Sequence, residues 1–164
     1  MTLATYSPES VVCLLGGVIP VDGFSNNTFI TIKKATPIFE TVVSADGVVS
    51  RTQIDNPLYS VSISLASTAQ TNEVLTALSY IDKKTGRGKL PLLIKDNSGT
   101  SLFYATQAWI EGTPDIEFSL DVGVRTWVFS CIGVSEIVGG NQSLFEIPTP
   151  LISLGSRLID ELLG

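Results

Sequence analysis

Residues 28–67 read TFITIKKATPIFETVVSADGVVSRTQIDNPLYSVSISLAS. Two runs rich in β-branched residues flank the turn sequence Ala45-Asp46-Gly47. An Asp-Gly pair supplies the positive φ angle that a tight hairpin turn requires. We therefore predict a long β-hairpin. Pro37 interrupts its first arm, because proline cannot donate to a sheet ladder, and residues 55–57 offer a bend in its second arm.

The second arm ends in a strict alternation of apolar and small polar residues. The apolar set is Tyr59, Val61, Ile63 and Leu65, and the alternating set is Ser60, Ser62, Ser64 and Ala66. A period of two predicts a strand with one face in the core and one face of small polar groups.

The tip of the predicted hairpin is apolar. Its candidate contact residues are Val42, Val43, Asp46, Gly47, Val48, Val49 and Arg51. An apolar hairpin that projects from a small domain is an aggregation hazard when it is left bare. We therefore predict that the tip docks on another subunit.

The composition indicates one globular domain with sparse surface charge. Of 164 residues, 44% are hydrophobic and 16% are charged, against about 25% charged residues in a typical globular protein. The net charge of −6 argues against a protein that grips nucleic acid through its phosphates. No apolar stretch reaches the ~18 residues of a membrane span. No basic residue precedes the apolar run 11–21, so we expect no signal peptide.

Residue types that support catalysis or metal binding are scarce. The chain has no histidine, which removes the commonest general base and the serine triad. Cys13 and Cys131 lie among apolar residues, so we expect buried reduced thiols, with a disulfide as the alternative. Two cysteines without histidine do not make an ordinary zinc site. We predict no enzymatic activity, no cofactor and no metal.

Two charged clusters have a structural interpretation. Asp115, Glu117 and Asp121 are the densest carboxylates, and two of them could share a strand face as a glycosidase pair does. No flanking apolar pocket is evident in the sequence, so an acidic strip that is exposed or faces a lumen is favoured. The basic residues at 83–89 include a Gly-Lys pair, but Leu90 replaces the Ser or Thr of a phosphate loop.

One helix is expected in the body of the chain, over residues 71–83. Its apolar face is formed by Val74, Ala77, Leu78 and Ile81, which recur at helical spacing. Thr71 or Asn72 is the expected N-cap, and Gly86 ends the helix.

The other segments predict strands. We expect a first strand over 11–15, with a kink or bulge at Gly16-Gly17 and a continuation over 18–21. Residues 90–95 and 101–111 form a second hairpin, anchored by Trp109 and Ile110. Strands over 116–120 and 122–133 follow, the latter with Trp127 and Phe129 on one face, and residues 139–141 close the domain.

The tail has a different pattern. Pro148 and Pro150 predict an extended arm, because each proline restrains the residue before it. A short amphipathic helix follows, with its apolar docking face formed by Leu151, Leu154, Leu158 and Leu162. Such a helix is marginal alone in water, so we expect it to pack either on its own domain or on a neighbouring subunit. We predict a β domain over 1–141 and an arm with a docking helix over 142–164.

Several segments, taken together, resemble one family. They are Gly16-Gly17-Val18, Asp22-Gly23-Phe24, Phe29-Ile30-Thr31-Ile32, Ser44-Ala45-Asp46-Gly47, Ser50-Arg51-Thr52, Val61-Ser62-Ile63-Ser64-Leu65, Asn72-Glu73-Val74-Leu75-Thr76-Ala77-Leu78, Pro91-Leu92-Leu93-Ile94-Lys95-Asp96, Ala108-Trp109-Ile110 and Pro114-Asp115-Ile116-Glu117-Phe118. Their order and spacing over about residues 10–141 resemble the tail tube proteins of contractile-tailed bacteriophages.

The resemblance implies a fold and a function. The implied fold is mainly β, with two packed antiparallel sheets of the sandwich or barrel type, one flanking helix and a long projecting hairpin. Six subunits would join into a ring, and rings would stack into a tube inside a contractile sheath, through which DNA passes without specific binding. The implied partners are further copies of the chain and the sheath, baseplate initiator and tail terminator proteins. The implied location is the virion tail, after assembly in the host cytoplasm.

Within such a tube, the sequence suggests roles for two surfaces. The hairpin tip would contact the adjacent ring. Ser60, Ser62 and Ser64 would line the lumen, because hydroxyls leave passing DNA indifferent; alternatively, this face meets solvent outside. The basic residues at 33–34 and 83–89 are expected to lie off the bore, since each cation on a phosphate favours binding.

Two other functions fit the same sequence. A tube of a phage-derived bacteriocin or of a type VI secretion system uses the same kind of fold. A monomeric β-sandwich binding module, such as a lectin-like domain, is the alternative from a different class.

Overall fold

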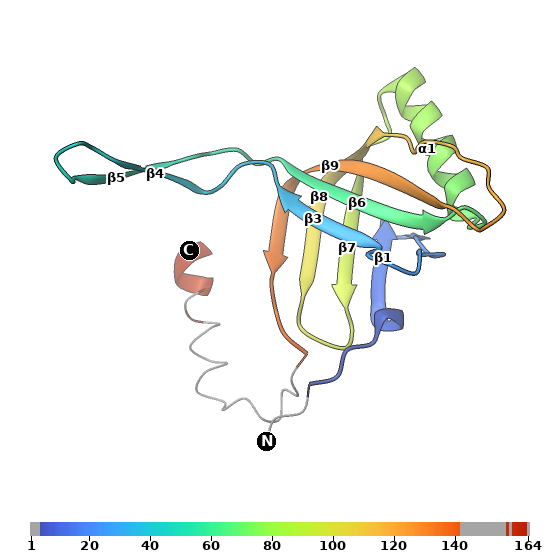
Figure 1. The fold of residues 1–164 in the computed structure, drawn as a ribbon, viewed down its shortest axis with the longest axis horizontal. Coiled ribbons are helices and arrows are strands. Elements are labelled where there is room, and N and C mark those ends of the chain that lie inside the picture. Colours follow the sequence, from blue (N-terminus) through green and yellow to red (C-terminus); the bar gives the residue numbers. More distant parts are fainter. Residues whose placement is uncertain (1–3, 142–156, 158, 164) are drawn as a thin grey trace.

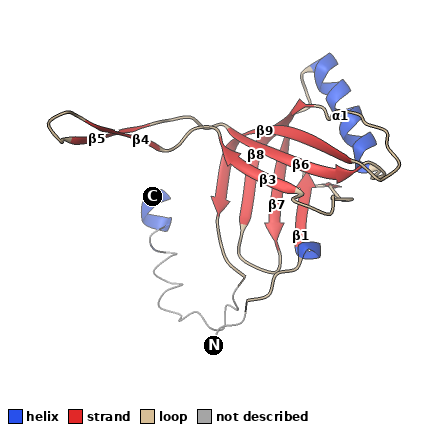
Figure 2. Cartoon of the chain, viewed as in Figure 1, coloured by secondary structure: helices blue, strands red, loops and turns tan. Residues whose placement is uncertain are grey.

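The computed structural model describes residues 4–141, 157 and 159–163 (Figure 1). The elements are η1 Pro8–Ser10, β1 Val11–Leu15, β2 Ile19–Pro20, β3 Ile30–Lys34, β4 Phe39–Val43, β5 Val49–Gln53, β6 Tyr59–Ala66, α1 Thr71–Thr85, β7 Leu90–Asp96, β8 Leu102–Gly112 and β9 Val124–Ile137. The mainly β architecture with one flanking helix and a projecting hairpin is as predicted (Figure 2).

Seven strands form one antiparallel sheet in the order β2-β1-β7-β8-β9-β6-β3. The sheet curls into two layers, because β9 serves both of them. Residues 124–131 of β9 pair with β6, and residues 128–137 pair with β8. In Figure 1, β3 and β6 cross in front of β7 and β8. The two predicted layers are thus halves of one continuous sheet.

The bend in β9 lies at Gly133, which has a φ angle of 65°. The residues of β9 that face the core change parity there, from Trp127, Phe129 and Cys131 to the partly buried Val134. A residue in the left-handed region produces this local change of direction, and glycine adopts it without steric cost.

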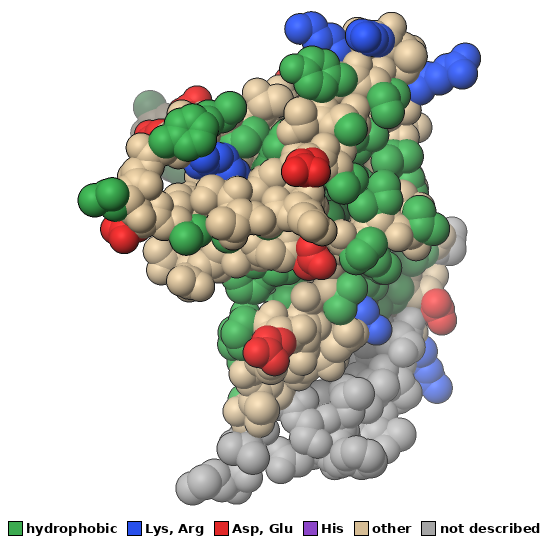
Figure 3. Space-filling view, turned by 90° about the vertical axis from the view of Figure 1, so that its right-hand side faces the viewer, with side chains coloured by type: hydrophobic (Ala, Val, Ile, Leu, Met, Phe, Trp, Pro, Cys, Tyr) green, Lys and Arg blue, Asp and Glu red, His purple; other side chains and the backbone are tan. Residues whose placement is uncertain are grey.

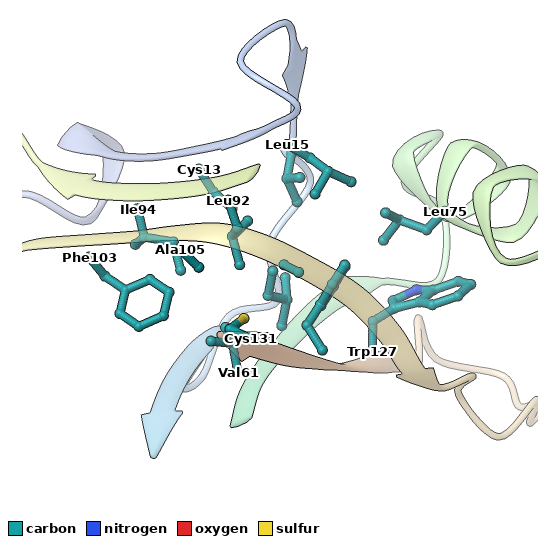
Figure 4. Packing of buried hydrophobic residues seen from close by; sticks show 14 of the residues in the cluster. Cys13, Leu15, Val61, Leu75, Leu92, Ile94, Phe103, Ala105, Trp127 and Cys131 are labelled. Carbon is teal, nitrogen blue, oxygen red and sulfur yellow. The ribbon is translucent and has the colours of Figure 1, made fainter. Parts of the chain in front are cut away.

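The core lies between the two layers. Val61, Ile63 and Leu65 of β6 are fully buried, as the alternation of residues 59–66 predicts. They pack with buried residues from the other layer, namely Cys13, Leu15, Leu92, Ile94, Phe103, Ala105 and Ala108 (Figure 4). Trp109 and Ile110, the predicted anchors of the second hairpin, are only half-buried, and Phe103 takes the central place.

Cys13 and Cys131 are buried and unbonded, as expected from their apolar neighbours. Burial raises the pKa of each thiol to about 12. Proximity to Cys131 contributes further to the raised pKa of Cys13. Both thiols are therefore protonated and unreactive at neutral pH.

The helix forms where the sequence predicts it, but with a different buried face. Leu75 is fully buried and Leu78 is partly buried, whereas Val74 and Ile81 are 42% and 52% exposed. The spacing of apolar residues fits burial of the Val74 face or of the Leu75 face. The structure buries the Leu75 face, and on this side of the helix the indole N–H of Trp127 donates to Asn72 Oδ1 at 2.9 Å.

The C-terminal cap of the helix is as predicted, whereas the N-terminal cap is a different residue. Gln70, and not Thr71 or Asn72, occupies the N-cap position, and it makes no capping hydrogen bond. The Thr71 hydroxyl instead donates to Asp22 Oδ1 at 2.8 Å, so it joins the helix to the preceding loop. Gly86 is the left-handed C-cap, as predicted.

Two predicted strands are corrected by the structure. Residues 18–21 do not continue β1; β2 turns back and pairs with β1, because Gly16 and Gly17 both have positive φ angles and form a tight turn. Residues 116–120 are not a strand, since no described strand pairs with them.

Gly133→Ala should destabilise the fold. A left-handed φ costs a residue with a Cβ atom about 1–2 kcal/mol, and a Cβ atom here would also overlap the Thr106 hydroxyl. We expect a loss of at least about 2 kcal/mol in the free energy of unfolding, measured in urea. Gly17→Ala is the control, because Gly17 has a φ of 75° but no atom lies within 4 Å of the place that its new methyl group would take. Equal losses for the two variants would contradict the role of the Thr106 contact.

Candidate assembly interface

The hairpin formed by β4 and β5 projects away from the body of the chain (Figure 1). Phe39–Val43 pairs antiparallel with Val49–Gln53, and these two strands make a separate sheet. Every residue of both strands is exposed. The predicted hairpin is confirmed, and its arms leave the main sheet around Pro37 and Pro57.

The register sorts the predicted tip residues onto two faces. Val43 pairs with Val49, and Thr41 pairs with Arg51, so Val43, Val49 and Arg51 share one face. Val42 pairs with Ser50, on the opposite face, and the alternation of residues places Val48 there as well. Apolar side chains therefore cover both faces of the tip, with exposures from 56% to 65%.

The turn at the tip is held by one acidic side chain. Val48 N–H donates to Asp46 Oδ1 at 3.4 Å, and the Ser44 hydroxyl also contacts this carboxylate. Gly47 has a φ of 84°, as the Asp-Gly turn requires. The Ser44 hydrogen bond, followed by backbone N–H donors, lowers the pKa of Asp46.

Further down the hairpin, Arg51 lies over an aromatic ring. Its Cζ atom is 4.3 Å from the centroid of Phe39. This cation–π contact keeps the only basic side chain of the predicted tip against its own hairpin.

The serine face is the outer face of the β3–β6–β9 layer. Ser60, Ser62 and Ser64 are half-buried, and Ser64 Oγ lies 3.1 Å from Thr126 Oγ1 of β9. Thr31 of β3 is opposite Ser62. The structure therefore extends the three predicted serines into a surface of hydroxyl groups from three strands.

One basic residue shares this hydroxyl surface. Lys33 is exposed and is the partner of Ser60 in the sheet register, so their side chains lie on the same face. Lys34 points to the other face, with Nζ 5.4 Å from the Tyr59 ring centroid. The two expectations, that the serine face lines a bore and that both lysines lie off it, are incompatible for Lys33.

Sequence reasoning missed a second exposed apolar segment, the loop after β8. Ile116, Phe118, Leu120 and Val122 are exposed by 70%, 93%, 106% and 67%. The apolar residues of this segment recur with a period of two, a pattern that predicts an ordinary strand. The acidic residues of the loop, Asp115, Glu117 and Asp121, alternate with these side chains and are exposed. None of them lines the three main surface pockets of the described chain, so they do not form the pocketed carboxylate pair of a glycosidase there.

The face that carries α1 shows a mixed surface (Figure 3). Basic side chains gather at its upper edge, and hydrophobic side chains are distributed below them. The exposed basic residues at the C-terminal end of α1 and just after it are Lys83, Lys84, Arg87 and Lys89. None of them forms a phosphate loop following a strand.

The predicted docking helix lies largely outside the described residues. Leu151, Leu154 and Leu158 are among the residues not described. Residues 157 and 159–163 are helical, and Leu162 is 84% exposed. Docking of this helix stays a prediction.

The described residues form neither a metal-binding group nor a membrane-spanning helix. Among them, no three His, Cys, Asp or Glu side chains are placed to hold a metal ion. No described helix has the length and apolar character needed to cross a bilayer.

The chain is similar to a phage structural protein and to proteins of contractile injection systems. No family model matches the chain. Structural protein ORF10 of Pseudomonas phage KPP10 is 31% identical over 148 residues, which cover 86% of each chain. The chain belongs to this family of phage structural proteins. The predicted resemblance to phage tail tube proteins is confirmed at the level of family and fold.

Solved structures with the fold of this phage structural protein come from contractile injection machines. The sheath-tube complex of the extracellular contractile injection system PVC, in its extended state, matches with a TM-score of 0.57 at 10% identity, covering 82% of this chain and 92% of that one. The anti-feeding prophage cap, a tube-terminating cap, matches with a TM-score of 0.53 at 10% identity over 84% and 94% of the chains. The sheath/tube terminator of PVC matches with a TM-score of 0.52 at 9% identity over 82% and 97%.

Ser44→Ala should raise the pKa of Asp46 toward that of an ordinary aspartate, because the largest contact that lowers it is removed. A lowered pKa means that the contacts which hold the turn are present above the usual titration range and are lost as the pH falls through the folded-state pKa. NMR titration of the Asp46 carboxyl carbon measures this change. Ser50→Ala is the control in the same hairpin, and identical midpoints for all three proteins would contradict the assignment.

Proposed function

We propose that this chain is the tube subunit of a contractile phage tail. Six copies join into a ring, rings stack into a hollow tube inside a sheath, and DNA passes through the bore. The observation that carries the proposal is the hairpin, in which two five-residue strands expose every residue and pair only with each other among the described strands. Such a surface is stable in solution only when another molecule covers it.

The hairpin is the contact between rings. Its tip residues Val42, Val43, Val48 and Val49 present apolar area on both faces, so it fits into a cleft between subunits better than onto a flat surface. Asp46 and Gly47 hold the turn, and Arg51 is retained against Phe39. The likeness to a sheath-tube complex supports this arrangement.

The hydroxyl surface is the wall of the bore. Ser60, Ser62, Ser64 and Thr126 offer short neutral side chains, which neither attract nor repel phosphates strongly. The net charge of −6 opposes retention of DNA. Lys33, at the end of this surface nearest the hairpin, is a single cation per subunit, and each cation adds only one counterion-release contribution to binding.

The size of the proposed ring is compatible with a duplex. Six subunits that each give about four strands, at ~4.8 Å spacing, have a circumference of roughly 115 Å before strand tilt. The corresponding bore remains open after side chains fill its wall, as in other wide barrels.

The proposal also covers partners and location. The partners are further copies of the chain, the sheath, a baseplate initiator and a tail terminator, and the site of action is the virion tail after assembly in the host cytoplasm. The role is structural and not enzymatic, as the name of the phage relative supports. The β domain of residues 1–141 forms the ring, and residues 142–164 act as an arm and helix that reach a neighbouring subunit.

A tube terminator is the second candidate, because two of the similar structures are a cap and a terminator. A terminator forms one ring on a finished tube, whereas a tube subunit polymerises without limit. Negative-stain microscopy of the purified chain at high concentration distinguishes the two: long tubes support the tube subunit, and single rings support the terminator. Monomers at all concentrations would instead support the monomeric binding module that the sequence also allows. A tube of a bacteriocin or type VI system would give the same images, and genomic neighbours decide that point.

Val48→Asp should prevent stacking while rings still form. The side chain is 56% exposed in the single chain, so the monomer tolerates the change. In the stacked tube it would bury an unpaired charge, at a cost of several (~3–5) kcal/mol per interface. Microscopy should show rings without tubes. Val48→Thr, which has nearly the same shape and no charge, is the control and should form tubes. Normal tubes from Val48→Asp would remove the tip from the stacking contact.

Ser62→Cys should place a thiol inside the bore. Cys13 and Cys131 are buried, and burial raises the pKa of each thiol to about 12, so neither should react with a maleimide and neither needs replacement. In assembled tubes, a small maleimide should label residue 62 and a maleimide too large to enter should not. Lys84→Cys, at an exposed helix position, is the control for both reagents. Labelling of Ser62→Cys by the large reagent along the tube would place the serine face outside.

A further inference from the structure

The loop between β8 and β9 has the pattern of a strand but lacks a strand partner. Its apolar residues Ile116, Phe118, Leu120 and Val122 all occupy even positions. Asp115, Glu117, Ser119 and Asp121 all occupy odd positions. An extended backbone would therefore separate them completely onto two faces. In the described chain, residues 113–122 form no backbone–backbone hydrogen bond.

A free sheet edge lies elsewhere on the same molecule. β3 is the last strand of the seven-stranded sheet and pairs only with β6 among the described strands. Phe29 C=O accepts from Ser64 N–H at 2.8 Å, and Ala35 N–H donates to Leu58 C=O at 3.0 Å, so odd-numbered residues bond toward β6. The N–H and C=O groups of Ile30, Ile32 and Lys34 consequently point away from the sheet, where another strand could pair with them.

An apolar groove runs beside this edge. It has a volume of about 670 Å³ and lies between β3 and the strands of the other layer. Ile30 and Ile32 line it from β3, and Ile94 and Phe103 line it from β7 and β8. The lining includes no residue of the loop 113–123. Its two carboxylates, Asp96 and Glu136, already accept hydrogen bonds from Ser98 and Tyr59.

The charge on the outer face of β3 is opposite in sign to the charges of the loop. Thr31 and Lys33 occupy the outer face of β3, and the inner face carries Ile30 and Ile32. A strand added here with its even positions inward would place its apolar side chains over the groove. Its odd positions, three of which are carboxylates, would lie next to Lys33, an arrangement that favours opposite charges across a strand pair.

We infer that residues 115–122 of one copy add as a strand to the free edge of β3 in the next copy. Ile116, Phe118 and Leu120 fill the apolar groove, and Glu117 or Asp121 lies beside Lys33. Main-chain hydrogen bonds supply affinity, and the alternating side chains supply specificity. The contact joins two different surfaces, so it is head-to-tail and can close into a ring. This inference rests on the proposed self-assembly and names the surfaces that join subunits within a ring.

The first test is Phe118→Asp in the full chain. The side chain is 93% exposed, so folding should be unchanged, which circular dichroism and thermal melting verify. We expect the concentration for half-assembly, measured by mass photometry, to rise at least about tenfold, because burial of one aromatic ring is lost and a charge is added. Tyr80→Asp, at a 60% exposed aromatic residue on α1, is the matched control and should assemble normally.

The second test mixes two defective chains. Lys34→Pro removes one outward N–H of β3 and blocks the edge, whereas its own loop remains intact. Phe118→Asp has the intact edge and the defective loop. At a concentration at which the wild type just assembles, each variant alone should remain monomeric, and the mixture should give one-to-one heterodimers through this contact. If Lys34→Pro melts early, Lys33→Glu replaces it, and Glu117→Lys with Asp121→Lys should then restore assembly.

Hydrogen exchange distinguishes strand addition from apolar contact alone. In wild-type assemblies, the amides of Ile32, Lys34 and alternate residues of 115–122 should exchange at least about tenfold more slowly than in the monomer. Rings that form normally from Phe118→Asp, or unprotected edge amides in wild-type rings, would overturn the inference and leave the proposed tube function standing. Wild-type chains that stay monomeric at every concentration would overturn both.

Discussion

The left-handed backbone at Gly133 is the constraint on which the rest of the fold depends. Residues 124–131 of β9 pair with β6 and residues 128–137 pair with β8, and Gly133 lies just past the point where β9 leaves β6. One strand thereby ties the two layers together, and the core closes between them without a second independent sheet. Residues 128–131 of β9 are paired on both sides, and the described sheet ends in the edge strands β2 and β3. The hairpin of β4 and β5 is a separate sheet that projects from the body.

Three of the places in the described chain where apolar side chains are exposed have several such residues close together. These are the hairpin of β4 and β5, the loop after β8 and one stripe of α1. Apolar side chains elsewhere in the chain are buried, such as Val61, Ile63 and Leu65 of β6 and Leu75 of α1. Exposed apolar area in this amount is unfavourable for a monomer and favourable for an assembly, because association removes it from water. These exposed surfaces support the proposal that the chain is a subunit of an assembly.

Electrostatics support the same view. Low charge allows subunits to pack closely without burying unpaired ions, which would cost more than the contact returns. The charges that remain are sorted by surface: basic residues gather at the end of α1, and the exposed carboxylates of the loop after β8 alternate with apolar side chains. Among the described residues, the outer face of the β3–β6–β9 layer carries mainly hydroxyl groups and the cation Lys33 of β3. In the proposed tube, such a surface would suit the passage of DNA, because few cations would bind its phosphates.

The sequence by itself determined the features that depend on near neighbours in the chain. The Asp-Gly turn, the alternation of residues 59–66, the extent of α1 and its Gly86 end were all predicted, because turn geometry and periodicity are local properties. Only the tertiary structure decided which stripe of α1 is buried, since the Asn72–Trp127 contact joins distant segments. It also decided that Gly16-Gly17 reverses the chain, that Lys33 shares a face with Ser60, and that residues 116–120 pair with none of the described strands. A strand is defined by the hydrogen bonds it makes to another segment, and no local pattern specifies where that segment is.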